Sequence, residues 1–107
     1  MLEITDLRAS SLLLSKDFEM DEIRLPDNPE DAFRHLHKLL SQKIGYLLDH
    51  DFERLMSICY IIDLKEEKVK EILSGLQAGN IAENLANLII QRQLQKVEIR
   101  RKYSPPS

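Results

Sequence analysis

The histidines of the sequence lie close to carboxylates, and this combination could hold a metal ion. Asp31 and His35 are four residues apart, so the two side chains would share one side of a helix. His50 and Glu53, three residues apart, would do the same. A metal site in a helical bundle needs such ligands to project inward from several helices, yet the inward positions here are filled by Leu, Ile and Phe. We therefore expect no metal ion and no cofactor, and we assign these side chains to capping and solvent contact.

Cys59 is the candidate nucleophile, because a thiolate can form a covalent intermediate with a substrate. Its neighbours Ile58, Tyr60 and Ile61 are uncharged, whereas a reactive thiol needs a nearby cation to lower its pKa. Cys59 is therefore expected to be a small core residue. The sequence also lacks a Gly-rich phosphate loop, a nucleophile elbow, a C-x-x-C motif and an H-E-x-x-H motif. These observations predict a protein that is not an enzyme.

Five basic residues near the end of the chain could bind a nucleic acid. Arg92, Lys96 and Arg100 recur at every fourth position and would form a stripe on a helix, joined by Arg101 and Lys102. We call these five residues the basic set, and a phosphate backbone could lie along them. Aromatic side chains that stack on bases are nearly absent from this stretch, and the sequence pI is only about 5.6. Nucleic-acid binding is therefore the second hypothesis.

The elements that carry these residues follow from composition. The chain has 107 residues, enough for one domain with one core. It has only 3 glycines and 4 prolines, and Leu and Ile dominate its apolar residues, which favours an all-α fold. The longest uninterrupted apolar run is residues 58–62, far too short to span a membrane. With a single cysteine and no secretory signal, a cytoplasmic location is expected.

The N-terminal segment, residues 1–28, is acidic and is expected to be partly irregular. Leu12, Leu13 and Leu14 are consecutive and show no clear helical period, so we expect at most one short helix there. Pro26 prevents a helix from continuing through this point. Residues 29–103 are expected to form a helical bundle, and residues 104–107 a frayed C-terminus.

Four helix starts are marked by capping residues within the predicted bundle. Asn28 precedes Pro29, which suits a first helical position, and Asp63 with Glu66 resembles a capping box. Asp49 or Asp51 and Asn80 with Glu83 give the other two signals. The bundle is thus predicted to contain four main helices, over residues 29–49, 51–62, 64–75 and 80–102.

The second of these helices is expected to be the centre of the bundle. Only Glu53, Arg54 and Ser57 are polar among its residues 52–62. A helix that is apolar on nearly every side needs packing partners on every side. This pattern predicts a structural element surrounded by the other helices.

Four phrases of the sequence resemble those of small, conserved bacterial helical proteins of unassigned function. They are L-P-D-N-P-E-D-A-F, D-H-D-F-E-R-L, I-D-L-K-E-E-K-V and L-I-I-Q-R-Q-L-Q-K. The resemblance covers about residues 24–103. It implies a helical fold, and it implies no activity, ligand or site residue.

The last predicted helix changes its apolar side along its length. Ile81, Leu85, Leu88 and Ile89 lie on an early side, whereas Ala86, Ile90, Leu94 and Val97 lie on a side turned by more than about 100°. One small core rarely serves both sides, so the later side is expected to be exposed. The predicted interface consists of Ile90, Leu94, Val97, Asn87 and Gln91.

This interface predicts a small interaction or assembly module. The expected partner is a second copy of the chain, as a homodimer, or another protein, because self-association through a two-fold axis is the commonest outcome for one exposed patch. The alternative is that the N-terminal segment, through residues 12–25, folds back and covers the same side of the helix.

Overall fold

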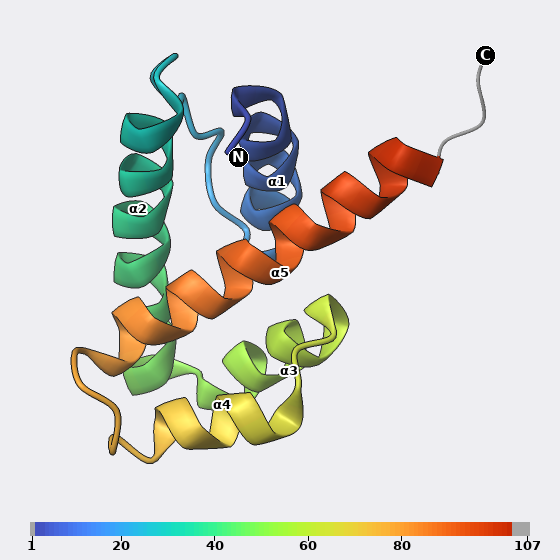
Figure 1. The fold of residues 1–107 in the computed structure, drawn as a ribbon. Coiled ribbons are helices and arrows are strands. Elements are labelled where there is room, and N and C mark those ends of the chain that lie inside the picture. Colours follow the sequence, from blue (N-terminus) through green and yellow to red (C-terminus); the bar gives the residue numbers. More distant parts are fainter. Residues whose placement is uncertain (1, 104–107) are drawn as a thin grey trace.

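The computed structural model describes residues 2–103, and its secondary structure is entirely helical within that range, which confirms the all-α prediction. The predicted frayed C-terminus, residues 104–107, lies outside the described residues. The helices are α1 (Ile4–Asp17), α2 (Pro29–His50), α3 (Phe52–Ile62), α4 (Glu66–Leu73) and α5 (Ile81–Tyr103) (Figure 1).

Three of the predicted caps start the helices that they were expected to start. The side chain of Asn28 accepts hydrogen bonds from the backbone N–H groups of Glu30 and Asp31, at 3.0 and 3.1 Å. Asp51 accepts from the N–H of Arg54 in the same way. Asn80 accepts from Glu83, which lies in the first turn of α5. Each cap satisfies a backbone donor that has no partner inside its helix.

Asp63 does not cap the following helix, so this part of the prediction is wrong. Its backbone is left-handed, with φ 66° and ψ 49°, and it ends α3. The N–H groups of Asp63 and Leu64 bond back to the carbonyl oxygens of Tyr60 and Cys59, at 3.0 and 3.1 Å. This is the Schellman pattern of a helix C-terminus, and an aspartate tolerates the left-handed position better than most residues do. The next helix, α4, therefore begins only at Glu66.

The centre of the bundle is α5, whereas the sequence predicted α3. α5 packs against all four other helices, and it crosses the molecule diagonally between α1 and α2 on one side and α3 and α4 on the other (Figure 1). α3 buries Leu55 and Ile62 but leaves Tyr60 86% and Ile61 66% exposed. Its partners α2 and α5 cover only one side of it, so α3 lies at the edge of the bundle.

The N-terminal segment is more regular than predicted. α1 has 14 residues, packs against both α2 and α5, and buries Leu7 and Leu14 completely. Its buried side also carries Ser10, Ser11 and Ser15. Small hydroxyls at core positions explain why counting apolar residues showed no clear period.

Candidate functional site

The structure divides the predicted interface between the core and the surface. Ile90 is fully buried, so its predicted exposure is wrong. Leu94 and Val97 are half-buried, and Asn87 and Gln91 are exposed. α1 packs along α5, so part of the N-terminal segment lies on this helix, although the alternative named residues 12–25 and α1 covers residues 4–17. The part of the predicted interface that remains exposed is therefore its polar border.

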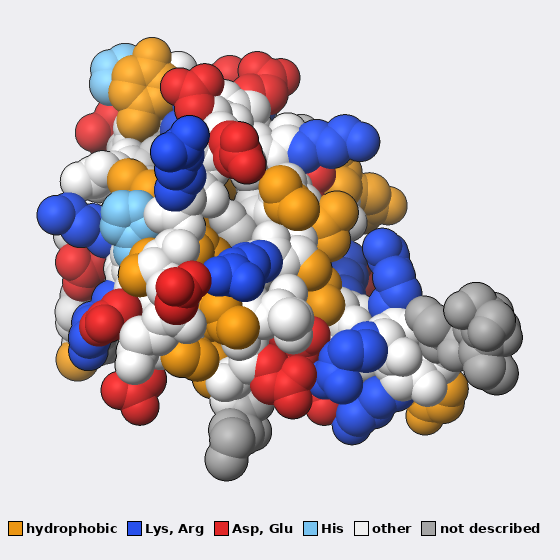
Figure 2. Space-filling view, turned by 90° about the horizontal axis from the view of Figure 1, so that it is seen from above, with side chains coloured by type: hydrophobic (Ala, Val, Ile, Leu, Met, Phe, Trp, Pro, Cys, Tyr) orange, Lys and Arg blue, Asp and Glu red, His pale blue; other side chains and the backbone are white. Residues whose placement is uncertain are grey.

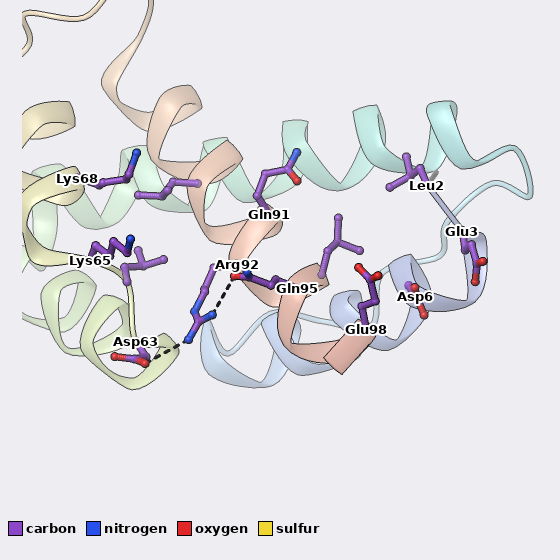
Figure 3. A pocket seen from close by; sticks show the side chains of 13 residues that line it. Leu2, Glu3, Asp6, Asp63, Lys65, Lys68, Gln91, Arg92, Gln95 and Glu98 are labelled. Atoms are coloured by element: carbon purple, nitrogen blue, oxygen red, sulfur yellow. Dashed lines mark hydrogen bonds and ion pairs between the residues drawn. The ribbon is translucent and has the colours of Figure 1, made fainter. Parts of the chain in front are cut away.

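A groove of about 820 Å³ follows that border (Figure 3). The floor is formed by α5. One wall consists of residues from the first part of the chain, between positions 2 and 6. The other wall consists of residues 63–65 and Lys68, where α3 gives way to α4. Three segments that are far apart in the sequence therefore form one surface.

The middle of the groove combines aliphatic and amide side chains. Leu88 and Leu94 are half-buried and pack against the core, with Leu64 beside them in one wall. Gln91 and Gln95 are exposed on the same side of α5. Leucines provide apolar area, and amides provide one donor group and one acceptor each. This mixture is typical of a surface that binds another protein.

The two ends of the groove carry opposite charges. Lys65 and Lys68 lie at one end beside Asp63, whose carboxylate is paired with Arg92, and Glu3, Asp6 and Glu98 lie at the other (Figure 3). A partner that lies along the groove would therefore meet cations first and carboxylates last.

A smaller hollow of about 230 Å³ extends the groove toward the start of α5. It shares Lys68, Leu88 and Gln91 with the groove and adds Asn84 and Asn87. The half-buried Asn84 and the exposed Asn87 and Gln91 thus form one continuous amide surface on α5.

Arg92 fixes the wall of the groove. Its Nη2 group donates to Oδ2 of Asp63 at 3.2 Å, and its Nη1 group donates to Oε1 of Gln95 at 2.9 Å. The bond to Asp63 connects α5 with the left-handed end of α3, and the bond to Gln95 lies within α5. Arg92 was predicted to contact phosphate in the nucleic-acid hypothesis, but here its charge is used within the protein.

Two further members of the basic set are also paired with carboxylates. Arg101 donates to both oxygens of Asp6, at 3.2 Å each, and lies 3.7 Å from Glu3. These carboxylates, Asp6 above all, raise the pKa of Arg101 further above its usual value. Lys102 lies 2.9 Å from Glu98 and lowers the pKa of that carboxyl group. The pair between Arg101 and Asp6 also fastens α1 to the C-terminal part of α5.

These ion pairs weaken the nucleic-acid hypothesis. Figure 2 shows Lys and Arg side chains interspersed with Asp and Glu side chains over the face that it presents. Lys96 is half-buried, and Arg100 is exposed. A phosphate backbone along the basic set would compete with carboxylates already in place.

Asp31 and His50, one member of each predicted pair, contact residues other than the predicted ones in the structure. Asp31 pairs with Arg34. The ring of His50 stacks on that of Tyr46, with 4.3 Å between the centroids, and its Nδ1 lies 2.9 Å from the backbone oxygen of Tyr46. Among residues 2–103 there is no group of three or more His, Cys, Asp or Glu side chains that could hold a metal ion.

Cys59 is buried in α3, as predicted. Burial raises the pKa of its thiol from 9.0 to about 11. A thiol reacts as a nucleophile in its thiolate form. Because its pKa is raised and its side chain is buried, the Cys59 thiol is protonated at neutral pH and shielded from reagents.

None of the helices described for this chain has the length and hydropathy needed to cross a membrane. Comparison of the chain with protein-family models, with curated proteins and with solved structures finds no match.

Proposed function

We propose that this chain is a non-enzymatic cytoplasmic interaction or assembly module that binds a second copy of itself through the outer side of α5. The observation that carries the proposal is the groove, in which half-buried leucines alternate with exposed amides. Protein interfaces combine an apolar centre with a polar rim in this way.

The proposal also agrees with the state of the reactive groups. The thiol of Cys59 is buried and its pKa is raised to about 11, which suits a structural role. The cations of Arg92 and Arg101 hold helices together. The ion pairs of Arg92 and Arg101 therefore stabilise the fold, whereas the exposed side of α5 is available to a partner.

Sedimentation equilibrium on the wild-type chain and on two matched variants tests the proposal. The Q91E/Q95E variant replaces two groove amides by carboxylates of nearly the same shape. Because both positions are exposed, we expect the fold to tolerate this change. In any pairing of two grooves, four added negative charges would face one another and weaken the dimer at least about tenfold. The control, Q42E/S57E, adds the same charge at exposed positions of α2 and α3.

We expect a wild-type dimer, a control that remains a dimer, and a Q91E/Q95E chain that is a folded monomer. Circular dichroism verifies that all three chains are helical. A wild-type chain that stays monomeric up to about 0.5 mM, where even weak dimers are populated, would exclude self-association as the function. A dimer that both variants leave intact would place the interface elsewhere on the surface.

A further inference from the structure

The charges of the groove are separated along the axis of α5. Leu88 and Glu98 mark its two ends on this helix, and at 1.5 Å per residue they lie about 15 Å apart. Lys68 lies beside Leu88, since both line the smaller hollow as well. Glu3 lies beside the C-terminal part of α5, since it contacts Arg101. The cationic end and the acidic end are therefore at opposite ends of one surface.

From this arrangement we propose that the second copy lies antiparallel in the groove, about a two-fold axis between the two ends. Lys65 and Lys68 of each copy then face Glu3 and Glu98 of the other. A two-fold interface uses the same patch on both subunits, so a patch with one positive and one negative end complements itself only in the antiparallel orientation. In a parallel pair, lysines would face lysines. This inference rests on the proposed self-association and specifies its geometry.

The charged side chains at both ends are accessible to a partner. Lys65 and Lys68 are exposed, and neither forms an ion pair with any residue in the range 2–103. The side chains of Glu3 and Glu98 are each about half exposed, although they contact Arg101 and Lys102. A carboxylate has room for more than one donor, so each can accept from a lysine of the second copy.

The centre of the groove suits the same orientation. An axis at the level of Gln93, midway between Leu88 and Glu98, would bring Gln91 of one copy opposite Gln95 of the other. Each amide can then donate to and accept from its counterpart. The half-buried Leu88 and Leu94 supply the apolar area that the amides surround.

Two charge-reversed chains, studied alone and mixed, test the orientation. The K65E/K68E chain has acidic groups at both ends of the groove, and the E3K/E98K chain has lysines at both. Each homodimer would face like charges at both ends, so we expect its Kd to rise at least about tenfold. In an equimolar mixture every end meets its opposite, and native mass spectrometry should find the heterodimer in excess over both homodimers.

A control matched to E3K/E98K is the E22K/E53K chain, which makes the same change of net charge at exposed positions outside the groove. Its dimer should keep the wild-type Kd. Thermal unfolding verifies that every chain folds. If the E3K/E98K chain does not fold, the single variant Glu98→Lys replaces it.

The outcomes test two statements separately: that the chain forms a dimer through the groove, and that the two copies are antiparallel. Recovery of a heterodimer in the mixture supports the antiparallel pair. A wild-type dimer that Q91E/Q95E disrupts, but whose charge-reversed chains do not prefer one another, keeps the proposed function and overturns the orientation. A wild-type monomer overturns both.

Discussion

Replacing Ile90 by alanine measures whether this side chain belongs to the core of its own chain. Ile90 is fully buried in the structure, although the sequence places it on an exposed stripe. The substitution removes three carbon atoms, and at about 0.8 kcal/mol each the lost burial amounts to about 2.4 kcal/mol. The cavity left between α5 and its neighbours adds to this loss. We therefore expect the free energy of unfolding to fall by about 3 to 4 kcal/mol.

Urea unfolding in the Q91E/Q95E background provides the assay, because the expected monomer separates folding from association. The midpoint should fall while the slope with urea stays constant. The control is Ile99→Ala, which removes the same atoms from a side chain that is 48% exposed on the same helix. We expect it to cost less than about 1 kcal/mol. Equal losses at Ile90 and Ile99, or a loss at Ile90 below about 1 kcal/mol, would refute the burial of Ile90 in the core of its own chain.

Three further predictions concern α3 and the basic set. Because folding raises the pKa of the Cys59 thiol from 9.0 to about 11, the free energy of unfolding should fall as the pH rises between these values. Urea unfolding should show that this fall in the free energy of unfolding is smaller for Cys59→Ala than for the wild-type chain. Equal falls in the two chains would contradict the raised pKa. Ile61→Ser should change the unfolding free energy by less than about 0.5 kcal/mol, whereas Leu55→Ala should lower it by about 2 to 5 kcal/mol; similar losses would return α3 to the centre of the bundle. In electrophoretic shift assays at low salt, the chain should bind neither DNA nor RNA at about tens of micromolar, and a salt-sensitive shift that is lost on neutralising the basic set would restore the nucleic-acid hypothesis.

The helix starts were predictable because capping is local. Asn28, Asp51 and Asn80 each bond to a backbone donor no more than three residues ahead, so the whole interaction is contained in a short phrase of sequence. Asp63 stands in an equally good phrase, but the chain turns sharply there and the left-handed end of α3 takes precedence. The capping signals at these positions are equally strong in the sequence, and the path of the chain determines which of them starts a helix.

The positions of α1 and α3 depended on information that periodicity does not contain. The hydroxyl of Ser15 donates to the carbonyl oxygen of Ser11, so a serine can be buried on α1 without a partner from another helix. Conversely, Tyr60 and Ile61 are apolar but exposed, because no element among residues 2–103 covers that side of α3. Hydrophobicity indicates what favours burial, and the packing of neighbours determines what is buried.

The groove was only half predictable. Gln91 and Leu94 could be found because they lie on one helix at helical spacing. Lys65 and Glu3 could not, since they reach the same surface from other segments through tertiary packing. Their charges alone carried no signal, because most charged residues simply face solvent.

The turn of the apolar side along α5 was taken to mean that the later side is exposed, but Ile90 on that side is fully buried. α5 packs against α1 as well as α2, and the pair between Arg101 and Asp6 connects α1 with its C-terminal part. A partner of α5 must therefore use what α1 leaves uncovered, namely half-buried leucines at the edge and exposed amides beyond them. Such a surface is narrower and more polar than the stripe that the sequence predicted. Its apolar area alone distinguishes poorly among partners, so in the proposed dimer the charges at its two ends would determine the orientation of the second copy.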